Sequence, residues 1–243
     1  MSLVPKLPKR SGKKKVFRIR LGKILFDLFL AFLTLTLVPV LIYSAANPQT
    51  TPLLWIRWLE NDQNEQYTRV IKRWVPLERI SPHLIKAVIT AEDQKFFQHR
   101  GFDWQAIESA IKVNLTSNRT LGASTISMQT SRNVFLWQGR NLFRKGLESY
   151  FTVLVENLWS KKRILEVYLN VIEWGKGVYG CDAASQHYFN HSCATLSPVE
   201  AAWLAAILPN PRSWSIHRPQ RHVEKRQARI LNSMVKVRLP RLS

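Results

Sequence analysis

The segment Ala87–Asp103, AVITAEDQKFFQHRGFD, is the stretch around which the rest of the chain is organised. It continues a predicted helix over 82–95, whose apolar residues recur at helical spacing from Ile85 to Ile89. Glu92 occupies the next position on that apolar stripe, seven residues after Ile85 and three after Ile89. A carboxylate there is costly to ionise, so its pKa is expected to rise, as enzymes arrange for a general acid or base.

Spacing alone leaves two interpretations of this acid open. Glu92 is either a buried catalytic carboxylate or a helix-end acid that reaches water or pairs with an arginine such as Arg100. After the helix, His99 is expected to be a hydrogen-bond partner and not a metal ligand, because no second His or Cys lies at ligand spacing. Gly101 is expected to adopt a positive φ where the chain turns.

The charge of the chain is strongly positive and unevenly placed. Its 243 residues include 36 Lys and Arg against 16 Asp and Glu, a net charge of +20. Residues 1–23 hold nine of the basic residues and no acid, whereas residues 47–243 hold 27 basic and 15 acidic residues. The part able to fold is therefore basic in its own right, which favours an anionic partner: nucleic acid, lipid headgroups or a phosphorylated substrate.

The N-terminal region predicts a membrane anchor. Residues 1–23 resemble a disordered basic tail, and residues 24–46 form an apolar run long enough to cross a bilayer as a helix. The alternative is a cleaved signal peptide ending at Ser44-Ala45-Ala46, for which the run is long. Because the cations precede the run, the N-terminus should stay in the cytoplasm and the remainder outside, away from nucleic acid.

The sequence between the anchor and the first helix, residues 47–80, is interpreted as a membrane-proximal linker, and residues 81–243 as the main domain. A short helix rich in Trp within the linker could lie at the membrane interface or pack on the domain, and the pattern does not separate these two placements.

Cys181 and Cys193 are spaced so that a disulfide is permitted in an oxidising compartment, but nothing in the spacing requires one. Their spacing is not that of a zinc site.

A second helix over 103–117 leads to the segment 121–133, LGASTISMQTSRN, in which Gly122 precedes two hydroxyl residues and a helical run. Such a helix start binds anions well, but Ser124 could equally serve only as the cap of its helix. The apolar residues 134–137 follow and could contact lipid or the core.

One or two long helices are predicted over 139–170. In their first turns Arg140, Arg144 and Glu148 follow one another at spacings of four, with Lys145 adjacent, which forms a mainly cationic ridge. The ridge suits a pyrophosphate, although a solvated face with helical ion pairs is the simpler interpretation. Further helices are expected after 163, after the capping box Ser197-Pro-Val-Glu200 and over 219–238, with little strand.

Five motifs in order carry a resemblance: AEDQKFFQHRGFD, GASTISMQTSRN, RKGLE, KKRILEVYLNVIEWGKGVYG and LSPVEAAWLAAILPNP. With them, residues 65–235 resemble the family 51 glycosyltransferases of bacterial cell-wall synthesis, in their monofunctional form without a transpeptidase domain. The resemblance implies a mainly α, lysozyme-like glycosyltransferase domain behind a single N-terminal transmembrane helix in the inner membrane. It also implies polymerisation of lipid II into a β-1,4-linked glycan, with inversion and release of undecaprenyl pyrophosphate.

The same resemblance assigns the site residues. Glu92 corresponds to the general base that takes the proton of the acceptor hydroxyl, and Glu148 to the second catalytic carboxylate on the donor side. The residues implied to surround the substrate are Asp93, His99, Ser124, Thr125, Gln129, Arg132, Asn133, Arg140, Arg144 and Lys145. The second motif departs from the family pattern at several positions. Among them, Arg132 keeps a positive charge, whereas Met128 replaces an amide and receives no role.

No metal site and no tightly bound cofactor are expected, although a divalent Mg or Mn ion is compatible with the donor pyrophosphate. The implied partners are lipid II, the growing glycan, the inner membrane and other cell-wall synthesis and division proteins, with the catalytic domain in the periplasm.

Two alternative functions remain open. A lysozyme-like hydrolase would also use two carboxylates, but it has no need of clustered cations. A non-catalytic scaffold would not need Glu92.

Overall fold

The structure, a computed structural model, describes residues 11–61, 71–117, 122–139, 141–217 and 219–240. The chain divides into two compact units, Met1–Ile42 and Tyr43–Ser243, and each is described by itself.

The first unit consists of the long helix α1, Ser11–Ala45, of which only the last residues belong to the second unit. Its segment Arg20–Ala45 has a mean hydropathy of 2.4 and is long enough and apolar enough to span a membrane. The hydroxyls of Thr34 and Thr36 donate hydrogen bonds to backbone carbonyls one turn earlier in the helix, so both donors are satisfied. Residues 11–23, expected to be disordered, are helical, because Lys and Arg are good helix formers.

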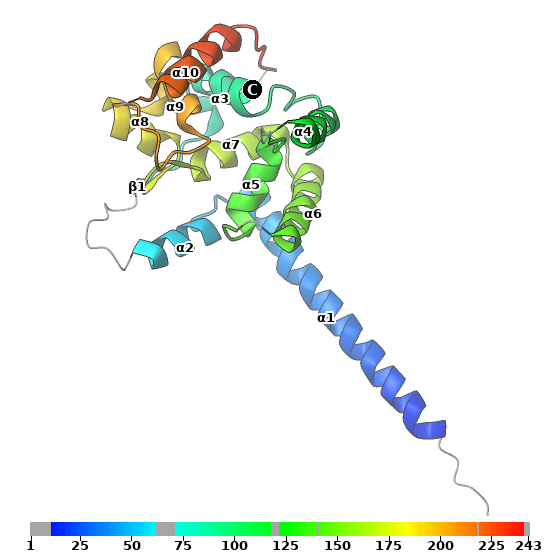
Figure 1. Ribbon diagram of the computed structural model, residues 1–243. Helices are drawn as coiled ribbons and strands as arrows, with labels where there is room; N and C mark the ends of the chain where they lie inside the picture. Colours follow the sequence, from blue (N-terminus) through cyan, green and yellow to red (C-terminus); the bar gives the residue numbers. More distant parts are fainter. Residues whose placement is uncertain (1–10, 62–70, 118–121, 140, 218, 241–243) are drawn as a thin grey trace, which may run out of the picture. The chain divides into compact units, whose positions relative to one another are not determined.

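The second unit is mainly helical, as expected, and one of its two helical groups is built around α3, Pro82–Glu92 (Figure 1). This helix packs against α9, Pro198–Ile207, and α10, Arg221–Met234. The apolar stripe of α3 is fully buried in the contact, and α9 is apolar almost all round. Burial on these faces is what fixes the axis of α3 and hence the position of Glu92 at its end.

The other group is built around α5, Ile126–Phe135, which packs against α6, Leu142–Leu158, and α7, Lys161–Val171. Helix α4, Trp104–Thr116, is more loosely attached, because Ala110 is its only buried residue. The predicted region 139–170 is therefore two helices, separated at Ser160, which caps α7.

Short elements complete the second unit. They are α2 Pro52–Asn61, η1 Leu77–Arg79, α8 Cys181–Phe189, η2 Cys193–Thr195 and the strands β1 Ile71–Lys72, β2 Glu173–Gly175 and β3 Val178–Tyr179. In the sheet, β3 lies between β1, to which it is parallel, and β2, to which it is antiparallel. The helix expected after 163 is α7, which ends at Val171 because β2 occupies 173–175.

Local signals in the sequence are confirmed at several helix starts. Ser81 caps α3, and Ser197 with Glu200 forms a complete capping box on α9. Gly101 has a φ of 87°, as the turn required. The apolar segment 134–137, which includes the end of α5, contributes Val134 and Leu136 to the core, whereas Trp137 is exposed.

Candidate active site

Glu92 is the last residue of α3, and both of its carboxylate oxygens are held by side chains from other helices. Arg226 of α10 donates from Nη2 to Oε1 at 3.0 Å, and Gln129 of α5 donates from Nε2 to Oε2 at 2.9 Å. The side chain of Glu92 is 14% exposed. Burial raises the pKa of Glu92 above its ordinary value, as the apolar stripe predicted, while Gln129, Arg226 and Arg132 oppose that rise.

The amide of Gln129 is itself oriented by Tyr168 of α7. The Tyr168 hydroxyl donates to Gln129 Oε1 at 3.1 Å, so the amide nitrogen must face Glu92. Tyr168 is almost completely buried, and burial raises the pKa of its hydroxyl well above the usual value. The hydroxyl therefore stays protonated and acts as a donor, which completes a chain from α7 through α5 to the end of α3.

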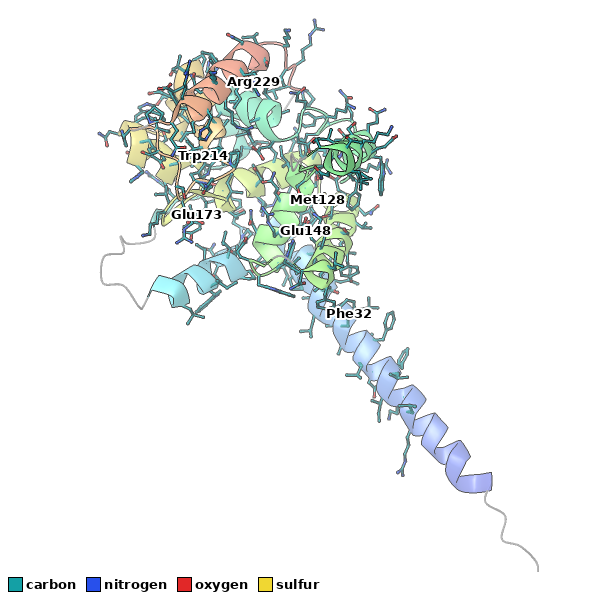
Figure 2. The ribbon with its side chains drawn as sticks, in the orientation of Figure 1. Phe32, Met128, Glu148, Glu173, Trp214 and Arg229 are labelled. Atoms are coloured by element: carbon teal, nitrogen blue, oxygen red, sulfur yellow. The ribbon has the colours of Figure 1, made fainter. Side chains whose placement is uncertain are left out.

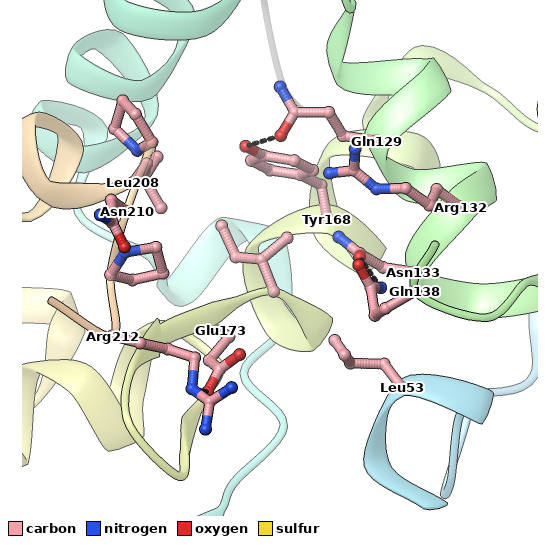
Figure 3. A pocket seen from close by; sticks show the side chains of 13 residues that line it. Leu53, Gln129, Arg132, Asn133, Gln138, Tyr168, Glu173, Leu208, Asn210 and Arg212 are labelled. Carbon is pink, nitrogen blue, oxygen red and sulfur yellow. Dashed lines mark hydrogen bonds and ion pairs between the residues drawn. The ribbon is translucent and has the colours of Figure 1, made fainter. Parts of the chain in front are cut away.

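A cavity of about 210 Å³ opens beside Gln129 and Tyr168 (Figure 3). It is lined by Leu53, Gln129, Arg132, Asn133, Gln138, Tyr168, Ile172, Glu173 and the segment Leu208–Arg212. Arg132 and Asn133 enter from α5, and Gln138 donates to Asn133 Oδ1 at 3.3 Å. The wall is therefore rich in amides and guanidinium groups, which are suited to sugar hydroxyls and phosphate oxygens.

Asp93 and His99 fasten the turn that follows α3. The Asp93 carboxylate meets His99 Nε2 at 2.9 Å and also accepts the backbone N–H of Ile126 at 3.0 Å, at the start of α5. Thr125 donates to the carbonyl of Gly101 at 2.6 Å and caps α5. The contacts of these three predicted substrate residues are internal, and they tie the end of α3 to the start of α5.

Glu148 lies on α6, where two cations bind it (Figure 2 labels Glu148 and Met128). Arg144 donates from Nη1 at 2.5 Å to one carboxylate oxygen, and Lys145 donates from Nζ at 2.5 Å to the other. Glu148 is 1% exposed and Arg144 is buried, whereas the Lys145 side chain is 43% exposed. The ridge predicted from spacing is therefore a buried ion-pair cluster with Lys145 at its open side, and Arg140 lies outside the described residues.

Lys145 lines a second cavity, of about 390 Å³, between α4, α5 and α6. Ser124 and Met128 line it together with apolar and aromatic side chains, among them Phe102 and Trp104. Of the predicted residues, three line the first cavity and Ser124 and Lys145 line the second, while neither Glu92 nor Glu148 is in the lining of either cavity. Helix α5 borders both, because Gln129, Arg132 and Asn133 face the first and Met128 the second.

Two residues at the centre of the site, Arg226 and Tyr168, were not identified from the sequence. Arg226 lies three residues after Val223 and four before Ile230, two apolar residues at helical spacing. That spacing indicates that Arg226 lies on the same face of α10 as these two buried residues. Tyr168 had no such signal, because nothing in its segment distinguishes a hydroxyl that orients an amide from one that packs in the core.

Within the described part of the chain, the acids of the site are held by cations and an amide. No cluster of three or more His, Cys, Asp or Glu side chains suited to a metal occurs among the residues that the structure describes. Glu148, the acid that the resemblance places on the donor side, already has a cation on each carboxylate oxygen. The Glu148 oxygens, each already paired with a cation, do not fit the role of ligands to a resident metal.

A family model described as Transglycosylase matches residues 60–235 of the chain, which include both acids and, apart from Leu53, the residues that line both cavities. The chain belongs to this family, as its motifs predicted.

Curated relatives agree over most of the chain. A biosynthetic peptidoglycan transglycosylase from Bdellovibrio bacteriovorus is 53% identical over 203 residues, or 84% of this chain and 81% of that protein. One from Caulobacter vibrioides is 46% identical over 210 residues, covering 86% and 89%. One from Rhodospirillum centenum is 43% identical over 239 residues, covering 98% and 95%, so the similarity extends into the N-terminal helix.

Proposed function

We propose that this protein is a peptidoglycan glycosyltransferase that polymerises lipid II into β-1,4-linked glycan strands and releases undecaprenyl pyrophosphate. The observation that carries the proposal is the setting of Glu92, a carboxylate of raised pKa held between Arg226 and Gln129, of which Gln129 also lines a polar cavity. The relatives named above, all peptidoglycan transglycosylases, support the choice of substrate.

In the proposed reaction Glu92 is the general base. It takes the proton from the acceptor sugar hydroxyl while that oxygen attacks the anomeric carbon of the donor, and the bond from that carbon to the pyrophosphate oxygen breaks. A raised pKa makes the carboxylate a stronger base near neutral pH. Gln129 and Arg226 keep both oxygens in place, so little reorganisation accompanies the transfer.

The leaving group carries negative charge, and the protein offers cations on the donor side. Lys145 is the exposed member of the Arg144–Glu148 cluster and faces the second cavity together with Ser124. Arg132 faces the first cavity. We assign Lys145 to the departing pyrophosphate, with its ammonium held in position by Glu148, whereas Arg132 adds positive charge on the side of Glu92. A hydrolase acting on a neutral glycan has no use for such cations.

The substrate is lipid-linked, and the surface near the second cavity suits a lipid. Leu142 is 91% and Phe143 72% exposed at the start of α6, and Trp104 is 72% exposed on α4. Large apolar side chains exposed together mark surfaces that meet lipid or protein. We place the N-terminus in the cytoplasm and the catalytic domain on the periplasmic face of the inner membrane, because the cations precede the membrane helix.

The test uses the full-length protein in detergent or vesicles, given lipid II in one reaction and preformed glycan in another. Polymer from lipid II with no cleavage of the glycan is the expected result. Shortened glycan with no polymer would instead establish the hydrolase. The absence of both products would favour a scaffold. Adding a chelator to the first reaction tests the mechanism further, since activity should persist without a divalent metal.

A further inference from the structure

The two cysteines of the chain lie side by side in the core, away from the residues assigned to catalysis. Cys181 is the first residue of α8 and Cys193 the first residue of η2, and both are completely buried. Their sulfur atoms are 3.4 Å apart. The turn between them is tight, because Asn190 adopts a left-handed φ of 60° at the end of α8. We propose that Cys181 and Cys193 form a disulfide in the native protein.

Hydrogen bonds hold the two backbone segments that carry the cysteines together. The Asp182 carboxylate accepts the backbone N–H of Cys193 at 3.0 Å and the hydroxyl of Ser192 at 2.9 Å. Each cysteine is thus next to, or part of, a hydrogen bond that joins the two segments. A sulfur–sulfur bond is about 2.05 Å long, so side-chain rotations that shorten the 3.4 Å separation by about 1.4 Å would complete it.

The alternatives for two facing thiols fit this place less well. A metal needs further ligands, and the described part of the chain holds no cluster of three metal-binding side chains. A reactive thiol needs access and a thiolate, but both sulfurs are buried, and burial raises the pKa of Cys181 well above its ordinary value. Two inert, enclosed thiols in contact are best explained as the two halves of a structural cross-link.

The oxidation balances with a disulfide-bearing thiol oxidoreductase as the oxidant. Two S–H bonds of the cysteines break and one S–S bond forms, and the oxidant's disulfide accepts two electrons and two protons to become two thiols. Because the folded protein encloses both sulfurs, the exchange takes place before α8 packs against η2. It depends on the periplasmic location proposed above, where such oxidants operate.

The cross-link would stabilise the N-terminal end of α3, the helix that carries Glu92. The carbonyl of Cys193 accepts the backbone N–H of Ser81 at 3.1 Å, and Ser81 caps α3, the helix that ends at Glu92. Closing the short loop between the cysteines removes freedom from the unfolded chain. Reduction should therefore lower the melting temperature by roughly 5–10 °C, while the rate of polymerisation at 25 °C is unchanged.

The test counts thiols in the full-length protein isolated from membranes. The sample is acid-quenched, denatured and treated with a maleimide-polyethylene glycol reagent, with and without prior reduction. Since the chain has only two cysteines, the expected result is no modification before reduction and two additions after it, on a band that migrates as a monomer. Two additions without reduction would overturn the proposal, as would a disulfide-linked dimer.

A second measurement does not depend on the thiol count. Cys181→Ala with Cys193→Ala should melt where the reduced wild type melts and should not respond to reductant. A wild-type melting temperature that is indifferent to reductant would contradict the bracing role. Protease added to intact spheroplasts reports the side of the membrane separately, so an error in the proposed location is told apart from an error about the disulfide.

Discussion

Replacing Glu92 by Gln tests the central assignment with almost no change of shape. The variant keeps the length and volume of the side chain but cannot accept a proton. General base catalysis typically contributes about 10²–10⁴-fold to a rate. At 1.36 kcal/mol for each tenfold change, this corresponds to roughly 3–5 kcal/mol of transition-state stabilisation. The kcat for lipid II polymerisation should therefore fall by about 10²–10⁴.

The contacts of Glu92 indicate that Glu92→Gln lowers the rate of catalysis far more than it changes the stability of the fold. Both partners of Glu92 are donors, Arg226 at one oxygen and Gln129 at the other, so the new amide nitrogen must face a donor. Against that cost, the variant no longer buries a charge that is expensive to desolvate. The two effects oppose each other, and the melting temperature at neutral pH should change by only a few degrees.

The assay measures polymer from labelled lipid II, with thermal melting recorded on the same preparations. Glu108→Gln is the matched control, because Glu108 is exposed and forms an ion pair with Lys112 one turn away on the same helix. It should keep the wild-type rate. A Glu92→Gln variant that polymerises at nearly the wild-type rate while remaining folded would refute the assignment of the base.

The remaining predictions concern the groups around the two acids. Burial raises the pKa of Glu92, so the acid limb of the pH profile of kcat/KM should lie above the ordinary glutamate pKa of about 4.3. Arg226 favours the ionised form, so Arg226→Gln should move that limb to higher pH, whereas Arg226→Lys should move it less. Tyr168→Phe removes only the hydroxyl that orients Gln129, and it should lower kcat by up to about tenfold, measured with melting curves as a control. Glu148→Gln leaves two cations without their anion and should cost about 3–5 kcal/mol in the free energy of unfolding, measured by denaturant titration.

Three outcomes would contradict these expectations. An acid limb that is identical in the wild type and in Arg226→Gln would mean that the arginine does not act on the charge of the base. A Tyr168→Phe variant with unchanged kcat would remove the role given to the amide orientation. A Glu148→Gln variant that is as stable as the wild type would show that the Arg144–Glu148 cluster is more hydrated than its burial indicates.

Some of the site could be predicted because the signal is local. The position of Glu92 on the stripe of Ile85 and Ile89 follows from helical geometry, and burial of that stripe explains the raised pKa. The spacing of Arg144 and Glu148 likewise placed them in contact on one helix. The spacing did not reveal that this ion pair is buried, because burial depends on what covers the helix.

The sequence by itself determined the helical composition, several helix caps, a helix long and apolar enough to span a membrane, and the family, since each depends on periodicity or on short ordered motifs. Only the tertiary structure decided which partners hold the base. Arg226 and Gln129 are 134 and 37 residues away from Glu92 along the chain, and helix packing brings them to it. The same packing placed some of the predicted substrate residues in two different cavities and brought Cys181 against Cys193. Contacts between distant segments follow from the burial of whole helix faces, which no local pattern encodes.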